Sequence, residues 1–163
     1  MYKLQLDRDF SRDLFFESSK ELRYWVVNAI ANMVVADDIV EKHEFVALQE
    51  AMGLLDSKEE ILDLMKKVKE RNLFEVKKII MDPDLAIKIF FYLAGIAVID
   101  GSLKKSETEL LKKCGNCLDL KVDFIRAVIS WSVKLMGINR KLTQDLKTSN
   151  SHRNSIIENI IMS

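Results

Sequence analysis

The chain has little of the two residues that most often interrupt helices and form tight turns. It holds one proline and five glycines in 163 residues, too few turn-forming residues for a sheet of many strands. Apolar residues make up 48% of the chain, as in globular proteins. A chain of this length can bury a core without disulfide or metal crosslinks. We therefore expect an all-α, single-domain helical bundle.

Net charge is also absent. The 25 basic and 25 acidic residues cancel, so the chain lacks the broad positive field that nucleic-acid-binding proteins usually carry. We expect no nucleic acid among its partners. Within this balance, the lysine-rich stretch from Lys66 to Lys78 is predicted to be a solvated helical face.

A long hydrophobic run is missing as well. The most apolar segment, "IFFYLAGIAVI", covers only residues 89–99, whereas a membrane-spanning helix needs roughly 20 apolar residues. We therefore predict a central core helix there and no transmembrane segment. The opening "MYKLQLDRDFSRDL" lacks the charged and apolar regions of a signal peptide, so we expect a cytoplasmic location.

Helix-start signals and apolar spacing predict several helices in the first half of the chain. Ser18 and Ser19 can cap a helix that begins near Lys20. Asp82 with Pro83 marks the start of the second half, because proline is favoured at the first helical position. The predicted elements of the first half are helices over residues 20–34 and 41–52, a helix opened by the capping-box pair Ser57 and Glu60, and a short helix over residues 73–81.

The two halves repeat one another at an offset of 63 residues. Helix caps align with helix caps, core residues with core residues and acidic turns with acidic turns, which indicates a duplicated helical unit. We predict two pseudo-twofold-related repeats, over about residues 20–80 and 83–140, within a domain of residues 1–140. A polar linker and a short amphipathic helix are expected over residues 141–163. The aligned pairs are Ser19 with Asp82, Leu22 with Leu85, Asp37 with Asp100, Glu44 with Glu107, Leu48 with Leu111 and Asp56 with Asp119.

Cysteine is scarce, and its two copies lie close together in "CGNC" (114–117). A zinc site would need a second pair of ligands, and a thioredoxin-type site would need a strand before the helix. Ala51 and Leu54 occupy the matching positions of the first half. We therefore predict that Cys114 and Cys117 pack in the core as reduced thiols that react slowly. The other residues predicted to be buried are Trp25, Met33, Leu48, Phe90, Leu93 and Leu111.

Each predicted junction between the first and second helix of a unit carries an aspartate seven residues before a glutamate. The first copy has Asp37, Asp38 and Glu44, and the second has Asp100 and Glu107. Convergent carboxylates bind Ca²⁺, Mg²⁺ or Mn²⁺, and a duplicated unit would bring both turns toward one axis. A divalent-cation site at these residues is therefore one expectation. The alternative is that the acids cap helices, whose N-termini favour negative charge.

The segments "ADDIVEKHE" (36–44) and "IDGSLKKSE" (99–107) carry a family resemblance. They are similar to the repeated A-D-G-x-[IV]-x-x-x-E motif of the TerB-like family, which is named for a tellurite-resistance protein. Asp38 stands in place of the glycine in the first copy, and Ile99 in place of the alanine in the second. The resemblance spans about residues 20–137.

This resemblance implies an all-helical, non-enzymatic module that works in stress, tellurite-resistance or metal-resistance systems. It implies protein partners, including a membrane-associated complex, and it places the family's acidic pairs on Asp37 and Glu44 and on Asp100 and Glu107. Two further functions stay open: a metal-assisted hydrolase that uses the same carboxylates, and a purely structural scaffold. A homo-oligomer is also compatible with the sequence.

Overall fold

The computed structural model describes residues 18–36, 42–73, 75–98 and 102–147, together with Glu158 and Ile160. For His43 and Glu44 the description is limited to the backbone. These ranges contain helices and no strands, which confirms the all-α prediction. The helices are α2 (Lys20–Val35), α3 (Lys42–Met52), α4 (Lys58–Glu70), α5 (Pro83–Ala97), α6 (Lys105–Cys117) and α7 (Val122–Lys147).

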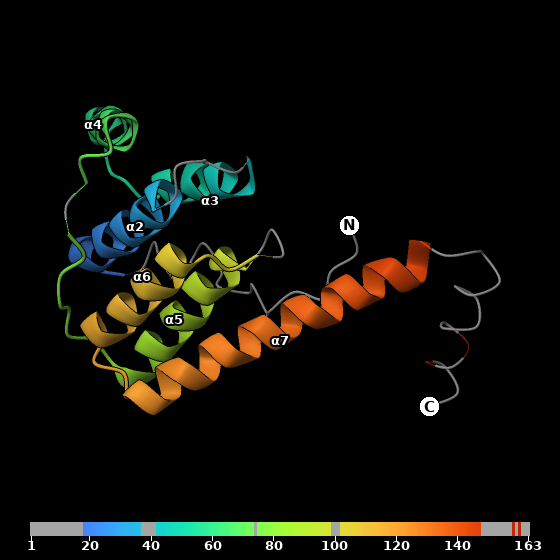
Figure 1. Ribbon diagram of the computed structural model, residues 1–163. Helices are drawn as coiled ribbons and strands as arrows, with labels where there is room; N and C mark the ends of the chain where they lie inside the picture. The colour runs from blue at the N-terminus through green and yellow to red at the C-terminus, as the bar shows by residue number, and fades with distance from the viewer. Residues whose placement is uncertain are drawn as a thin grey trace.

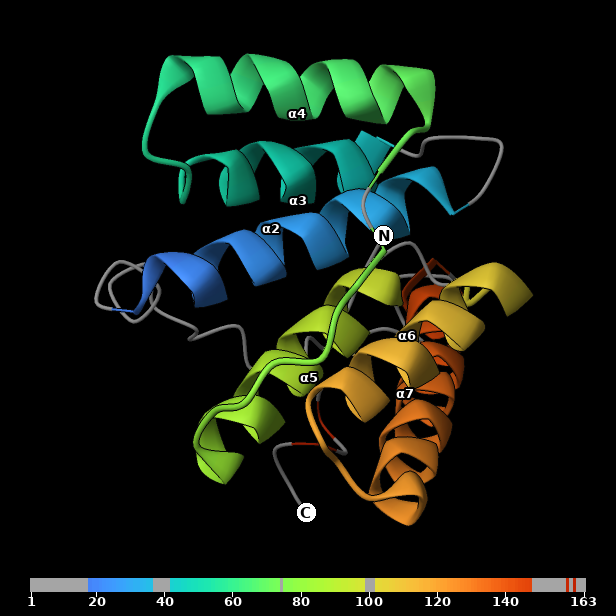
Figure 2. The same ribbon diagram turned by 90° about the vertical axis from the view of Figure 1, so that its left-hand side faces the viewer.

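The helices form two groups that meet along α2 and α5. Helix α2 contacts α3, α4, α5 and α6, while α5 also contacts α3, α6 and α7. Figure 1 shows α4, α3 and α2 on one side of this contact and α5, α6 and α7 on the other. In Figure 2 helix α4 is the outermost layer, separated from α5 by α3 and α2. The described helices include none that is both long and apolar enough to cross a membrane.

The predicted caps start the helices where expected. Ser19 Oγ accepts a hydrogen bond from Leu22 N at 3.3 Å. Asp82 Oδ2 accepts from Asp84 N at 3.2 Å and from Leu85 N at 3.3 Å, just before Pro83 at the first helical position. Each contact satisfies an amide that the helix itself leaves free.

The predicted capping box at the start of α4 is complete. Glu60 N donates to Ser57 Oγ at 3.2 Å, and Ser57 N donates to Glu60 Oε2 at 3.1 Å. Asp56 N donates to the same Glu60 oxygen at 3.0 Å. One carboxylate therefore fixes the turn between α3 and α4 and the first turn of α4 together.

Equivalent helices of the two halves begin at nearly constant offsets. Lys20 and Pro83 start α2 and α5, and Lys42 and Lys105 start α3 and α6, both at the predicted offset of 63. The starts of α4 and α7 differ by 64. The second half thus has one extra residue before its third helix, where Asp119 adopts a left-handed backbone with φ 59°. The predicted offset of 63 residues therefore does not align α4 with α7.

The core is centred on α2 and α5. All six apolar residues predicted to be buried are buried, which confirms that part of the sequence analysis. Phe91 of α5 makes edge-on ring contacts with Phe124 and Trp131 of α7, at centroid distances of 6.1 and 6.3 Å. These contacts hold the long helix α7 against α5.

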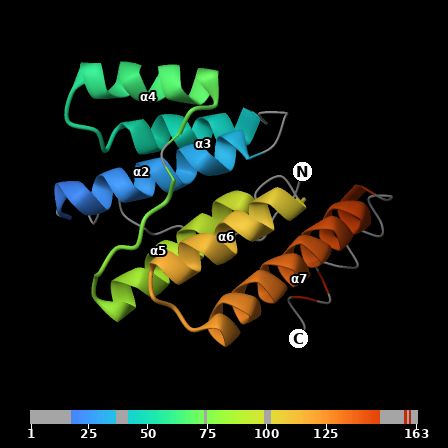
Figure 3. The same cartoon turned by 60° about the vertical axis from the view of Figure 1, so that its left-hand side comes forward.

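The prediction of a short helix over residues 73–81 is wrong. Residues 75–81, which we call the strap, have no helical structure and connect the two helical groups. Figure 3 shows the chain leaving α4, running past α2 and reaching the start of α5. The strap uses its backbone groups on distant partners: Lys77 O accepts from Trp25 Nε1 at 2.6 Å, and Ile79 N donates to Cys117 O at 3.0 Å. In a helix these backbone N–H and C=O groups would bond to other groups of the same segment and could not reach distant partners.

The expected boundary at residue 141 also needs correction, because α7 continues to Lys147. The last part of this helix is polar, yet residues such as Arg140, Lys141 and Gln144 are good helix formers. Met136 and Thr143 of the same helix are buried. The polar linker expected over residues 141–163 therefore begins inside a helix, and most of its remainder lies outside the described residues.

The packing of α6 against α5 and α7 predicts a sharp difference between two glycines. A Cβ atom at Gly115 would lie 2.6 Å from Ile125 Cδ1 and 2.7 Å from Ile125 Cγ1, whereas a Cβ at Gly137 would meet nothing within 4 Å. We expect Gly115→Ala to destabilise the fold by about 1–3 kcal/mol through overpacking. Gly137→Ala should stabilise it by up to about 1 kcal/mol, since alanine favours the helix. Urea denaturation of both variants measures this, and an unaffected Gly115→Ala would contradict the packing.

Candidate functional site

The predicted cation site lies mostly outside the described residues. Asp37, Asp38 and Asp100 lie outside the described residues, and only the backbone of Glu44 is described. Among the described residues no group of three or more histidine, cysteine, aspartate or glutamate side chains could hold a metal ion. The proposed approach of Asp37 to Asp100 therefore stays a prediction.

The helices that flank these segments begin at the predicted offset of 63 residues. Glu44 is the third residue of α3, and Glu107 is the third residue of α6. Helices α2 and α5 run in similar directions, so that their carboxyl-terminal ends lie on the same side of the molecule in Figures 2 and 3.

Glu107 is the one predicted ligand whose side chain is described, and it is buried with only 2% of its surface exposed. Its Oε2 atom accepts a hydrogen bond from Lys104 N at 2.8 Å. This is the contact that the third residue of a helix makes in a capping box. Glu107 thus caps α6. This is the role that the helix-capping alternative predicts for the acidic residues.

A second candidate site, which the sequence analysis missed, is a cleft between α2, α4 and the strap. Its volume is about 520 Å³. The apolar part of its lining comes from all three elements, and charged side chains from α2, α4 and the strap surround it. The apolar and aromatic lining residues are Tyr24, Trp25, Val27, Leu55, Leu64, Leu73 and Ile79.

Ion pairs fix the end of this cleft where α4 begins. Asp56 binds Arg23 Nη1 at 3.0 Å and Lys20 Nζ at 3.4 Å, and Lys20 Nζ also lies 3.4 Å from Glu60 Oε1. The Lys20 ammonium lies 5.0 Å from the centre of the Tyr24 ring, within cation–π range. These contacts attach the first turn of α4 to the first turn of α2.

Tyr24 and Glu60 influence each other inside this network. Burial raises the pKa of the Tyr24 hydroxyl, and the Glu60 carboxylate raises it further. The pKa of Glu60 is lowered, first by the Tyr24 hydroxyl, then by the amides of Asp56 and Ser57 and the charge of Lys20. Within the described part of the chain the Tyr24 hydroxyl has no hydrogen bond of regular geometry. The interaction is therefore a close approach of the two groups.

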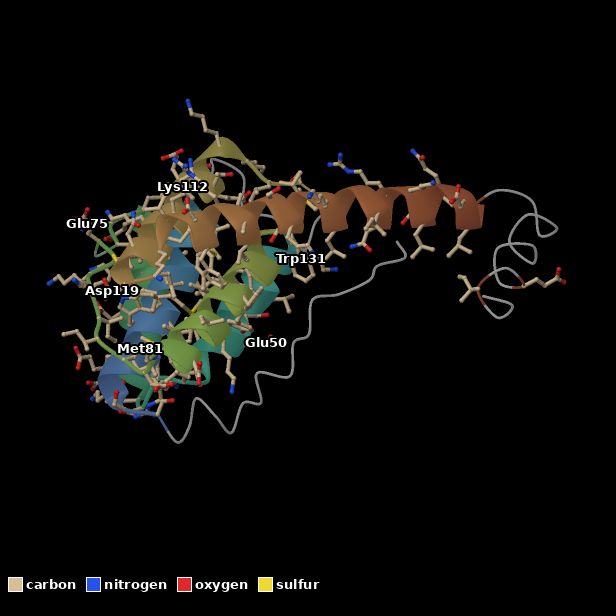
Figure 4. The ribbon with its side chains drawn as sticks, turned by 90° about the horizontal axis from the view of Figure 1, so that it is seen from below. Glu50, Glu75, Met81, Lys112, Asp119 and Trp131 are labelled. Carbon is tan, nitrogen blue, oxygen red and sulfur yellow. The ribbon has the colours of Figure 1, made fainter. Side chains whose placement is uncertain are left out.

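The strap closes the other side of the cleft. Its Glu75 carboxylate pairs with Lys113 of α6, which lowers the pKa of Glu75. Val76 and Ile79 are buried, while Ile80 is 93% exposed. Figure 4 shows the two ends of the strap, Glu75 and Met81, on the same end of the bundle as Asp119, far from Trp131 on α7.

The two cysteines lie beneath the strap. Cys114 is fully buried, and burial raises its pKa to about 12, with a smaller contribution from the nearby Cys117. Cys117 is half-buried, its pKa is also raised chiefly by burial, and its Sγ lies 3.5 Å from Val76 O as a donor. Both thiols are free. Core packing is thus confirmed for Cys114, and Cys117 packs at the edge of the core.

Comparisons of the chain with protein-family models, with curated proteins and with solved structures give no match.

The buried thiol generates a prediction for alkaline conditions and for labelling. Because the folded-state pKa of Cys114 is about 12, well above the unfolded value of about 8.5, its contribution to stability is complete below about pH 8.5. That contribution is lost progressively as the pH rises from about 8.5 toward the folded-state pKa of about 12. In a Cys117→Ser variant we expect a thiol reagent at pH 8 to label Cys114 only after unfolding. Labelling of the native protein at the rate of a free thiol would show that Cys114 is accessible.

Proposed function

We propose that the chain is a non-enzymatic TerB-like module that acts through protein partners and binds a divalent cation at its two acidic turns. The observation that carries the proposal is the equivalence of the helix starts in the two halves, which supports the duplication that the resemblance requires. Glu44 and Glu107 are each the third residue of their helix, which is consistent with a repeated acidic motif.

The cation would be held by Asp37, Asp38, Glu44, Asp100 and Glu107, with Ca²⁺, Mg²⁺ or Mn²⁺ as the candidate ions. Carboxylate and backbone oxygens are the ligands that these ions prefer. Support comes from the two helices α2 and α5, whose carboxyl-terminal ends lie on the same side of the molecule. Carboxylates gathered there would repel one another, and a bound cation would relieve that repulsion.

A structural scaffold is the second candidate, and one contact favours it. Glu107 already caps α6 through Lys104 N, which is a sufficient role for a buried carboxylate at this position. On this account the acidic residues stabilise turns, and the module presents its surface to partners without a metal. A role in a stress or tellurite-resistance response follows from the family resemblance alone and belongs to the proposal in either form.

Calorimetric titration with each ion separates the two candidates. We expect Ca²⁺, Mg²⁺ or Mn²⁺ to give saturable heat and to raise the melting temperature, because a ligand specific to the folded state stabilises it. Asp100→Asn should abolish both effects. It should also stabilise the ion-free protein, since one negative charge is removed while an oxygen remains.

Asp119→Asn is the matched control. It removes a carboxylate from the same half at an exposed position, and asparagine tolerates the left-handed backbone there. The control should keep the response of the wild type. If the wild type gives no saturable heat and no melting shift with any of the three ions, the scaffold account stands and the cation site is rejected.

A further inference from the structure

The cleft between α2, α4 and the strap combines an apolar lining with a charged rim, as peptide-binding grooves do. The apolar lining is continuous with the core, because Trp25 and Ile79 are buried and Leu64 and Leu73 pack partly against the same cluster. Helix α4, which forms one wall, has no fully buried residue. Leu64 of this helix lines the cleft and is half-buried, so part of its side chain is available to a ligand there.

The carboxylates of the rim are largely neutralised within the molecule. Glu60 lies 3.4 Å from Lys20, Asp63 lies 2.7 Å from Lys67, and Glu75 pairs with Lys113. Glu21 is the remaining carboxylate of the lining. These pairs leave the acidic side chains of the cleft with little charge to offer a ligand.

The lysines of the strap are different. Lys77 and Lys78 both line the cleft and are exposed, and within the described ranges neither has an ion-pair partner. The backbone beneath them is fixed, because Lys77 O accepts from Trp25 Nε1 at 2.6 Å. Apart from the charged groups that are already paired, the lining holds these two lysines and the single carboxylate of Glu21. The unpaired positive charge of the cleft therefore lies on the strap.

From this arrangement we infer that the cleft binds an acidic, amphipathic segment of a partner protein. Apolar side chains of the segment enter between Tyr24, Leu64 and Leu73, and its carboxylates pair with Lys77 and Lys78. The concave, apolar lining fits a peptide with one apolar face, whereas a flat anionic lipid surface would reach the lysines alone. The inference rests on the proposed role as a protein-interaction module and adds the site and the chemistry of the partner.

The test selects ligands from a displayed library of random peptides of about 15 residues, long enough for a helical face. Selection on the wild-type protein should enrich peptides with apolar residues at helical spacing and an excess of aspartate and glutamate. The affinity of an enriched peptide should fall about tenfold or more in Lys77→Glu/Lys78→Glu, because charge pairs at an interface become repulsions. Binding to the wild type should also weaken as salt is raised.

Lys134→Glu/Lys141→Glu is the matched control, since it reverses two exposed lysines on α7, away from the cleft. The control should bind as the wild type does. A second cleft variant, Leu73→Ala, should lower the affinity without changing the charge. Circular dichroism of each variant establishes that the fold is intact.

Three results would overturn the inference: no enrichment of acidic peptides, equal affinity in the cleft variant and the control, or binding to phosphatidylserine vesicles through Lys77 and Lys78 without peptide binding. The cation titration is independent of these lysines. Peptides that bind the wild type and the cleft variant equally would therefore reject the cleft while leaving the interaction module in place. If the wild type binds no ion, the inference about the cleft is unaffected.

Discussion

The need to cover α5 on several sides determines how the rest of the molecule is arranged. This helix has charged side chains only at Asp84 and Lys88, and Ile89, Phe90 and Leu93 are completely buried. Each such side chain contributes about 1.5–3 kcal/mol when it leaves water. No single neighbour can cover such a helix, so α2, α3, α6 and α7 all pack against it. The two helical groups consequently share one core.

The strap and the cleft follow from that shared core. The chain must pass from the outer helix α4 to the start of α5, and it does so across the outside of α2, where Trp25 and Cys117 bind its backbone. Because the strap is fixed there and α4 stands out from the core, a cleft is left between them. The ion pairs around Asp56 hold the start of α4 in place. The proposed binding of an acidic partner segment thus depends on the same contacts that join the two groups.

Local rules were sufficient for the helix starts, because the contacts of Ser19 and Ser57 involve residues three positions away. They failed for the strap, whose spacing of apolar residues suits a helix but whose backbone partner Trp25 lies 52 residues away in sequence. Such a tertiary contact overrides helix propensity, and its presence could not be inferred from one sequence. The cleft was unpredictable for the same reason. For the acidic residues, the cap that Glu107 forms was one of the two predicted roles, and the cation remains a proposal.

The measurement that most directly tests a shared core with an outer wall is native-state hydrogen exchange of individual amides at increasing denaturant. The account predicts that the buried amides of α2, α5 and α6 exchange only through global unfolding, with one common free energy. Amides of α4, which has no fully buried residue, should exchange through a smaller local opening. Different limiting free energies for α2 and α5, or an α4 as protected as α5, would contradict a single core shared by the two helical groups.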